Sequence, residues 1–138
     1  MSQEDVEVVL DQYAATNERD FRRAMSYYDD DVELIAEEPW LRAGVFKGRE
    51  AVGSWFGDWF STFDRDAQFD VKEARELEDG TVLLVAEHHA RGRASGVEVH
   101  GTVIWVHRLR GGKITRVESF ASREEALEAA RLRAETSG

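Results

Sequence analysis

The sequence predicts an α+β fold in which the second half of the chain forms a mostly antiparallel sheet. Three apolar segments follow one another within residues 81–120, and glycine-containing turns at 94–96 and 110–113 separate them. Such turns are typical of tight hairpins. The helical patterns precede and follow this meander and do not alternate with its strands. The chain therefore differs from a fold of repeated β and α units.

Helical spacing marks two segments near the amino terminus. Apolar residues recur at helical intervals within 6–14, after a capping pattern of Ser2 and Asp5. A second, shorter pattern covers 21–28 and ends in the three aspartates 29–31. We interpret these aspartates as a solvated junction between helix and strand. A cation site is less favoured because adjacent side chains diverge.

Between these helices and the meander, the chain predicts a strand, a loop, a helix and another strand. The first strand is expected at 32–36, and an irregular loop with the only proline follows at 37–48. Helical spacing returns at 50–63 with a wide aromatic face, which favours deep burial over cofactor binding. Residues 67–77 predict a strand that turns into the meander. The sheet thus has at least five strands.

A helix after the meander is the last predicted element. Ser122 and Glu125 form a capping-box pattern, and apolar residues from Ala126 to Ala130 follow at helical spacing. The tail from Arg133 onward is expected to fray, because chain ends are poorly ordered unless they are tied down.

Composition removes several classes of function. The 138 residues fit one domain, 1–138, and the absence of cysteine excludes disulfides and thiolate sites. The formal net charge of −10, from 18 basic and 28 acidic side chains, disfavours binding to nucleic acid. No apolar run resembles a signal peptide or a membrane span, so we expect a cytoplasmic protein without membrane contact.

Three short motifs resemble the NTF2-like superfamily, in its SnoaL-like or ketosteroid-isomerase-like branch. They are the residues 28–32 entering the first strand, 46–52 opening the third helix, and 111–114 in the last hairpin. The resemblance implies a cone-shaped fold in which a curved, mostly antiparallel sheet surrounds a pocket. Three helices of the amino-terminal half would lie over the pocket, a short helix would end the chain, and homodimers would be common. The fold alone does not choose a function.

The catalytic groups of ketosteroid isomerases, which the resemblance implies, are absent. Ala36 and Trp105 occupy the positions where those enzymes have aspartates. Their tyrosine would fall near Gln12, beside Tyr13. We therefore do not expect steroid isomerisation.

Matching the meander to the family's cone places one face of its strands toward the pocket. Because strand side chains alternate, this face comprises Leu84, Ala86, His88, Val99, Gly101, Val103, Trp105 and His107. Tyr13, Trp40 and Trp59 are the further candidate pocket residues, from the first helix, the loop and the third helix. Large aromatics such as Trp40 either plug a core or line a cavity mouth.

His88 and His107 are the candidate catalytic residues. A neutral imidazole on an apolar wall can act as a general base or a hydrogen-bond donor. The alternative is a structural histidine satisfied by a tyrosine, a carbonyl or water; it is at least as well supported as catalysis for His88 and better supported for His107. His88 and His89 point to opposite faces and cannot share a metal. No spacing supports a site of His88, His107 and Glu37, so neither metal nor cofactor is expected.

The reverse face of the meander carries an apolar patch of Leu83, Val85, Ile104 and Val106. Such a patch needs cover, and we expect a second copy of the chain to supply it in a homodimer.

Two functions fit these observations. The first is binding of a small apolar molecule, with acid–base catalysis as an isomerase, cyclase, dehydratase or hydrolase. The second is a non-catalytic binding or dimeric interaction module. An open cavity would favour the first, whereas tryptophans collapsed into the cone would favour an interaction module.

Overall fold

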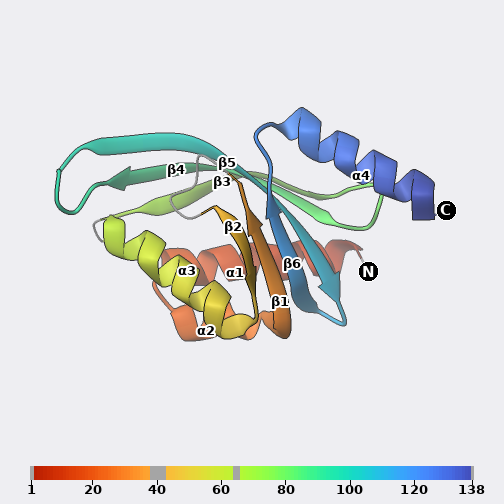
Figure 1. Ribbon diagram of the computed structural model, residues 1–138, viewed down its shortest axis with the longest axis horizontal. Coiled ribbons are helices and arrows are strands. Elements are labelled where there is room, and N and C mark those ends of the chain that lie inside the picture. The colour runs from red at the N-terminus through yellow and green to blue at the C-terminus, as the bar shows by residue number, and fades with distance from the viewer. Residues whose placement is uncertain (1, 38–42, 64–65, 138) are drawn as a thin grey trace.

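A computed structural model describes residues 2–37, 43–63 and 66–137, which form a curved, unclosed six-stranded sheet and four helices (Figure 1). The helices are α1 (Ser2–Asn17), α2 (Phe21–Ser26), α3 (Arg49–Thr62) and α4 (Arg123–Ser137). The strands are β1 (Tyr28–Ala36), β2 (Gly44–Lys47), β3 (Gln68–Glu76), β4 (Val82–Arg91), β5 (Glu98–Arg110) and β6 (Lys113–Ser119). Their order is β2-β1-β6-β5-β4-β3, and β1 runs parallel to β6 while the other neighbours are antiparallel. The predicted α+β class is confirmed.

The hairpin of β4 and β5 forms the long arm of the sheet. The two strands pair without a register shift from Val82 opposite His107 to Arg91 opposite Glu98. β6 is much shorter than β5 and pairs with it only from Trp105 onward. Among the described residues, no strand pairs with residues 98–103 on the side away from β4. This half of β5 therefore has a free edge.

The main core lies between the concave face of the sheet and the helices α1 and α3 (Figure 1). Trp55 of α3 and Trp105 of β5 are both 2% exposed, and their ring centroids lie 6.0 Å apart. Trp59 stacks on Trp55 at 6.1 Å. The deep part of the cone is thus filled by packed indole rings, as the aromatic pattern of α3 predicts.

Helix α4 covers the convex face of the sheet, where the sequence predicted a second copy. Leu83 is fully buried, and Ile104 and Val106 are less than a tenth exposed. They form a separate apolar cluster with Ala126 and Ala130 of α4. The premise of the expected dimer through Leu83, Val85, Ile104 and Val106 is therefore wrong, because the chain covers this patch with its own last helix.

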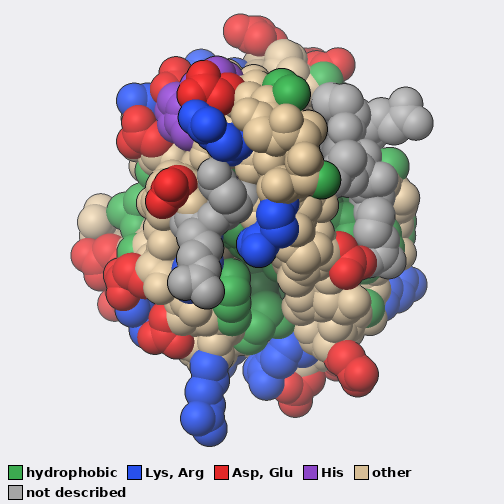
Figure 2. Space-filling view, turned by 90° about the vertical axis from the view of Figure 1, so that its left-hand side faces the viewer, with side chains coloured by type: hydrophobic (Ala, Val, Ile, Leu, Met, Phe, Trp, Pro, Cys, Tyr) green, Lys and Arg blue, Asp and Glu red, His purple; other side chains and the backbone are tan. Residues whose placement is uncertain are grey.

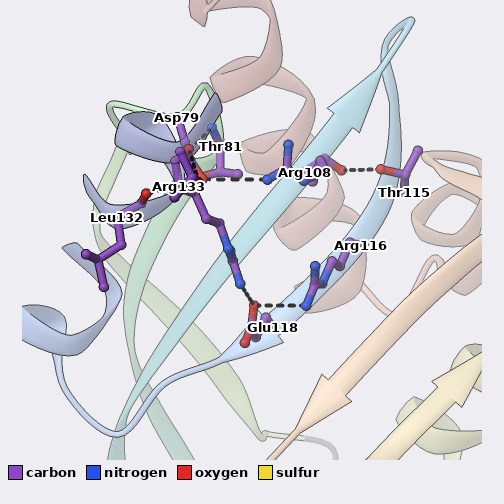
Figure 3. A network of polar contacts seen from close by, with 9 residues as sticks. Asp79, Thr81, Arg108, Thr115, Arg116, Glu118, Leu132 and Arg133 are labelled. Atoms are coloured by element: carbon purple, nitrogen blue, oxygen red, sulfur yellow. Dashed lines mark hydrogen bonds and ion pairs between the residues drawn. The ribbon is translucent and has the colours of Figure 1, made fainter. Parts of the chain in front are cut away.

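The predicted fraying from Arg133 is also wrong, since α4 continues to Ser137. Arg133 lies 3.0 Å from Glu118 of β6, and Arg116 lies 3.6 Å from the same carboxylate (Figure 3). This three-residue ion-pair network ties the end of the helix to the sheet. At the start of α4, Ser122 accepts a hydrogen bond from the Glu125 amide at 3.1 Å, which confirms the predicted cap.

Two strand boundaries differ from the prediction. β1 begins at Tyr28, so Asp29, Asp30 and Asp31 lie within a strand and not at a junction before it. The predicted loop contains the strand β2, which pairs with β1. The pattern of β2 gave no signal because its residues are mostly exposed and do not alternate in burial.

No helix in the described ranges is long and apolar enough to cross a membrane.

Candidate functional site

A cavity of about 390 Å³ lies beside the free edge of β5. It is lined by Trp59 of α3, His88 of β4, residues 99–104 of β5, and Ser119, Phe120 and Ala121 at the end of β6. Side chains from both faces of β5 take part, because the cavity reaches around the strand edge that β6 leaves unpaired. The difference in strand length thus positions the cavity.

Gly101 provides room in this cavity. It lies directly opposite His88 in the β4–β5 ladder, so a side chain at 101 would stand next to the imidazole. A Cβ atom added at Gly101 would meet no atom within 4 Å. The absent side chain therefore leaves open space on the same face of the sheet as His88.

His88 is a buried polar group in aromatic surroundings. Only 3% of the residue is exposed to solvent. The rings of Trp59, Phe63 and Phe69 have centroids 5.0, 5.2 and 4.9 Å from the imidazole centroid. The Nε2 atom is buried and has no hydrogen-bond partner. Buried polar atoms without a partner are rare, and each is unfavourable by about 1–3 kcal/mol.

The electrostatic setting keeps the His88 imidazole neutral. Burial lowers its pKa to about 4, and the nearby charges of His89 and Arg19 act in the same direction. At pH 7 the ring therefore carries one N–H donor and one lone pair. Such a group can donate a hydrogen bond to a ligand oxygen or accept one from a hydroxyl.

The structure places His107 away from this cavity. His107 has no exposed surface, its Nε2 lies 3.3 Å from the Tyr13 hydroxyl, and its Nδ1 lies 3.4 Å from the carbonyl oxygen of Val82. The Tyr13 hydroxyl can donate to Nε2 when the ring proton is on Nδ1. Burial lowers the pKa of His107 to about 4 and raises that of Tyr13. Both residues thus belong to the core beneath α1.

The two histidines do not form a common site. His107 lies opposite Val82, which is six positions from His88 along β4, or about 20 Å of strand. The two-histidine metal site with Glu37 is therefore not formed.

Of the pocket residues proposed from the sequence, five line the cavity: Trp59, His88, Val99, Gly101 and Val103. Leu84, Ala86 and Trp105 instead pack in the core. Trp40 lies outside the described residues. The sequence reasoning missed the other lining residues, which are His100, Thr102, Ile104, Ser119, Phe120 and Ala121. The different lengths of the last two predicted strands were the signal that could have revealed the free edge they surround.

The fold and this cavity define an NTF2-like protein. The sequence profile of the SnoaL-like domain matches residues 9–117, and the chain belongs to this family. No curated protein matches the sequence.

Solved structures share the fold at low sequence identity. Bal32a, from a soil-derived mobile gene cassette, is 20% identical with a TM-score of 0.79, covering 86% of this chain and 89% of that chain. TerC, co-crystallised with polyporic acid, is 19% identical with a TM-score of 0.73, covering 93% and 98%. A Mycobacterium tuberculosis protein in complex with estradiol-17β-hemisuccinate is 15% identical with a TM-score of 0.73, covering 90% and 97%.

Proposed function

We propose that this protein binds a small, largely apolar molecule in the cavity beside His88, and that the molecule forms a hydrogen bond with the imidazole. The unpartnered Nε2 of His88 carries this proposal, because the imidazole lines a cavity of about 390 Å³ and has no protein partner for that atom. A ligand with one polar atom would satisfy it.

The walls of the cavity favour an uncharged ligand. None of the described lining residues is an aspartate, glutamate, lysine or arginine. A charged ligand would lose hydration without gaining an opposite charge. Trp59 and Phe120 supply aromatic surface. Ring-containing compounds fit these walls, and the ligands in the TerC and M. tuberculosis structures, polyporic acid and estradiol-17β-hemisuccinate, support a ligand with rings but not the absence of an acidic group.

Acid–base catalysis by His88 is the second candidate function. A perturbed pKa in a cavity is typical of catalytic groups. However, an imidazole with a pKa of about 4 is a weak base at pH 7, so it gives little driving force for proton removal. Ligand binding is the function that the geometry supports best. An isomerase, cyclase, dehydratase or hydrolase activity would need a second polar group, and Thr102 and Ser119 line the same cavity.

The filled cone also bears on the interaction-module alternative. Trp55 and Trp105 occupy the deep interior, which is the arrangement expected of a module without a pocket. The cavity lies outside this filled interior, beside the free edge of β5, so a ligand would bind there and not at the centre of the cone. An interaction module was expected to use the convex apolar patch, but α4 buries this patch within the chain.

A titration of the purified protein with steroids and quinones tests the proposal. Tryptophan fluorescence should change in a saturable way, because Trp59 lines the cavity. The variant Gly101→Leu should weaken binding at least about tenfold, since the leucine would occupy the ligand's space. Gly57→Leu is the matched control, because a Cβ at this exposed helical glycine also meets no atom within 4 Å.

The proposal fails if no compound gives a saturable change. It also fails if Gly101→Leu binds the best compound as tightly as the unmodified protein.

A further inference from the structure

Two histidines face each other on the outer surface of the β4–β5 arm. His89 and His100 are directly opposite in the antiparallel ladder, and their side chains are 45% and 63% exposed. Their Nδ1 atoms lie 2.9 Å apart. Figure 2 shows a histidine patch bordered by acidic and basic side chains at one edge of the molecule. Strand alternation puts this pair on the face of the sheet opposite His88, although His100 also lines the cavity at the strand edge.

Each imidazole also has a carboxylate near its other nitrogen. Glu87 lies 3.6 Å from Nε2 of His89, and Glu98 lies 4.0 Å from Nε2 of His100. The four side chains thus form a row in which two carboxylates flank two imidazoles, and both Nδ1 atoms point to the centre.

Two neutral imidazoles cannot place their protons so that every contact in this row is a hydrogen bond. If one ring carries its proton on Nδ1 to donate to the other, its Nε2 turns a lone pair toward a carboxylate, which is repulsive. If both rings carry their protons on Nε2, the carboxylates are satisfied but two Nδ1 lone pairs face each other at 2.9 Å. A cation between the Nδ1 atoms removes the conflict.

We propose that His89 and His100 bind a divalent transition-metal ion of the zinc type through their Nδ1 atoms. Imidazole nitrogen is a preferred ligand for such ions, whereas magnesium and calcium prefer oxygen. With Zn–N bonds of about 2.0–2.1 Å, two nitrogens on a tetrahedral ion lie about 3.3 Å apart. The exposed rings reach this separation by moving a few tenths of an ångström.

The surroundings complete the site. Histidines that bind metal usually donate their other N–H to a carboxylate, and Glu87 and Glu98 stand where these acceptors are needed. A hollow of about 340 Å³ next to the pair is lined by both histidines and by Asp66, Ala90, Arg91 and Glu98. It has room for water at the remaining coordination positions, since no carboxylate of the described residues forms a group of three close ligand atoms with both histidines.

A second group of possible ligands overlaps the first. Asp70, Glu87 and His89 offer atoms that lie within 4.8 Å of one another. However, the ammonium of Lys72 lies 2.8 Å from Asp70 and 3.7 Å from Glu87, so a cation already neutralises these carboxylates. At the histidine pair, Arg91 lies 3.0 Å from Glu98, but the closest contact between the two imidazoles is Nδ1 to Nδ1, and within the described residues no basic side chain contacts these two atoms. The sequence reasoning weighed His88 with His89, and His88 with His107 and Glu37, but it did not consider His89 with His100 as metal ligands across two strands.

Zinc titration of the full chain, followed by competition with a chromophoric chelator, tests the site. One zinc ion should bind per chain. Both His89→Ala and His100→Ala should weaken binding by more than the roughly 10–100-fold that the loss of an outer carboxylate causes. Asp70→Asn should leave the affinity unchanged. Because these side chains are exposed, thermal unfolding without zinc should be the same in all variants.

The imidazole nitrogen resonances give an independent readout. Zinc should shift the Nδ1 signals of both histidines. The proposal is overturned if the unmodified protein binds no zinc. A proton shared between the two Nδ1 atoms would then be the cation that removes the conflict. It is also overturned if Asp70→Asn loses zinc while His100→Ala retains it, because the ion would then lie in the carboxylate group.

Discussion

Replacing His107 by glutamine should reduce the dependence of stability on pH. His107 has no exposed surface, and burial lowers its pKa to about 4. In the unfolded chain a histidine has a pKa of about 6.5. Between these values the unfolded chain binds more protons than the folded protein. The stabilisation is thus fully present above about pH 6.5 and is lost as the pH falls through the folded pKa.

The size of this effect follows from the two pKa values. Each pH unit within the window changes the free energy of unfolding by up to about 1.4 kcal/mol per histidine, which sums to about 3 kcal/mol for His107. His88, whose pKa is also lowered to about 4, adds a comparable change. Carboxylates such as Glu73, whose pKa is lowered by Arg123, lose their contribution only at lower pH.

Urea unfolding at about pH 7, 6 and 5 measures this dependence. The unmodified protein should lose stability at each step. His107→Gln should be less stable at pH 7, because it disturbs the contacts with Tyr13 and Val82, but its loss between pH 6 and 5 should be roughly half as large. Equal losses in both proteins, or an NMR titration of His107 near pH 6.5, would refute the assignment of this ring to a dry core.

Two further substitutions test the faces of the sheet. Ile104→Asp should lower the free energy of unfolding by about 3–5 kcal/mol, because it buries a carboxylate under α4. If the stability is unchanged and light scattering shows that the molar mass is halved, the dimer interpretation would be restored. His88→Ala should weaken binding of a compound found in the fluorescence titration at least about tenfold, whereas His89→Ala should leave it unchanged. Equal losses in these two variants would show that the binding site is not on the concave face.

Strand alternation accounts for much of what the sequence could predict. It separated His88 from His89 and put Gly101 on the same face as His88, and the ladder places Gly101 directly opposite that ring. Periodicity also located the aromatic helix α3 over the core. These features depend on short-range geometry, which the sequence carries directly.

The sequence could not predict features that depend on how elements meet. The stripe of Ala126 and Ala130 indicated a helix but not which face of the sheet it covers. The depth of the cavity depends on how far Trp55 and Trp105 fill the cone, which is a matter of tertiary packing. The pairing of His89 with His100 required the register of two strands, and a shift by one residue would have separated them.

A crystal structure of the protein with the tightest-binding compound from the titration would show whether His88 binds the ligand. We expect the compound to lie at the free edge of β5, between Trp59 and Gly101, with a polar atom within hydrogen-bond distance of Nε2 of His88. A compound bound elsewhere, with this nitrogen still unpaired, would contradict this expectation.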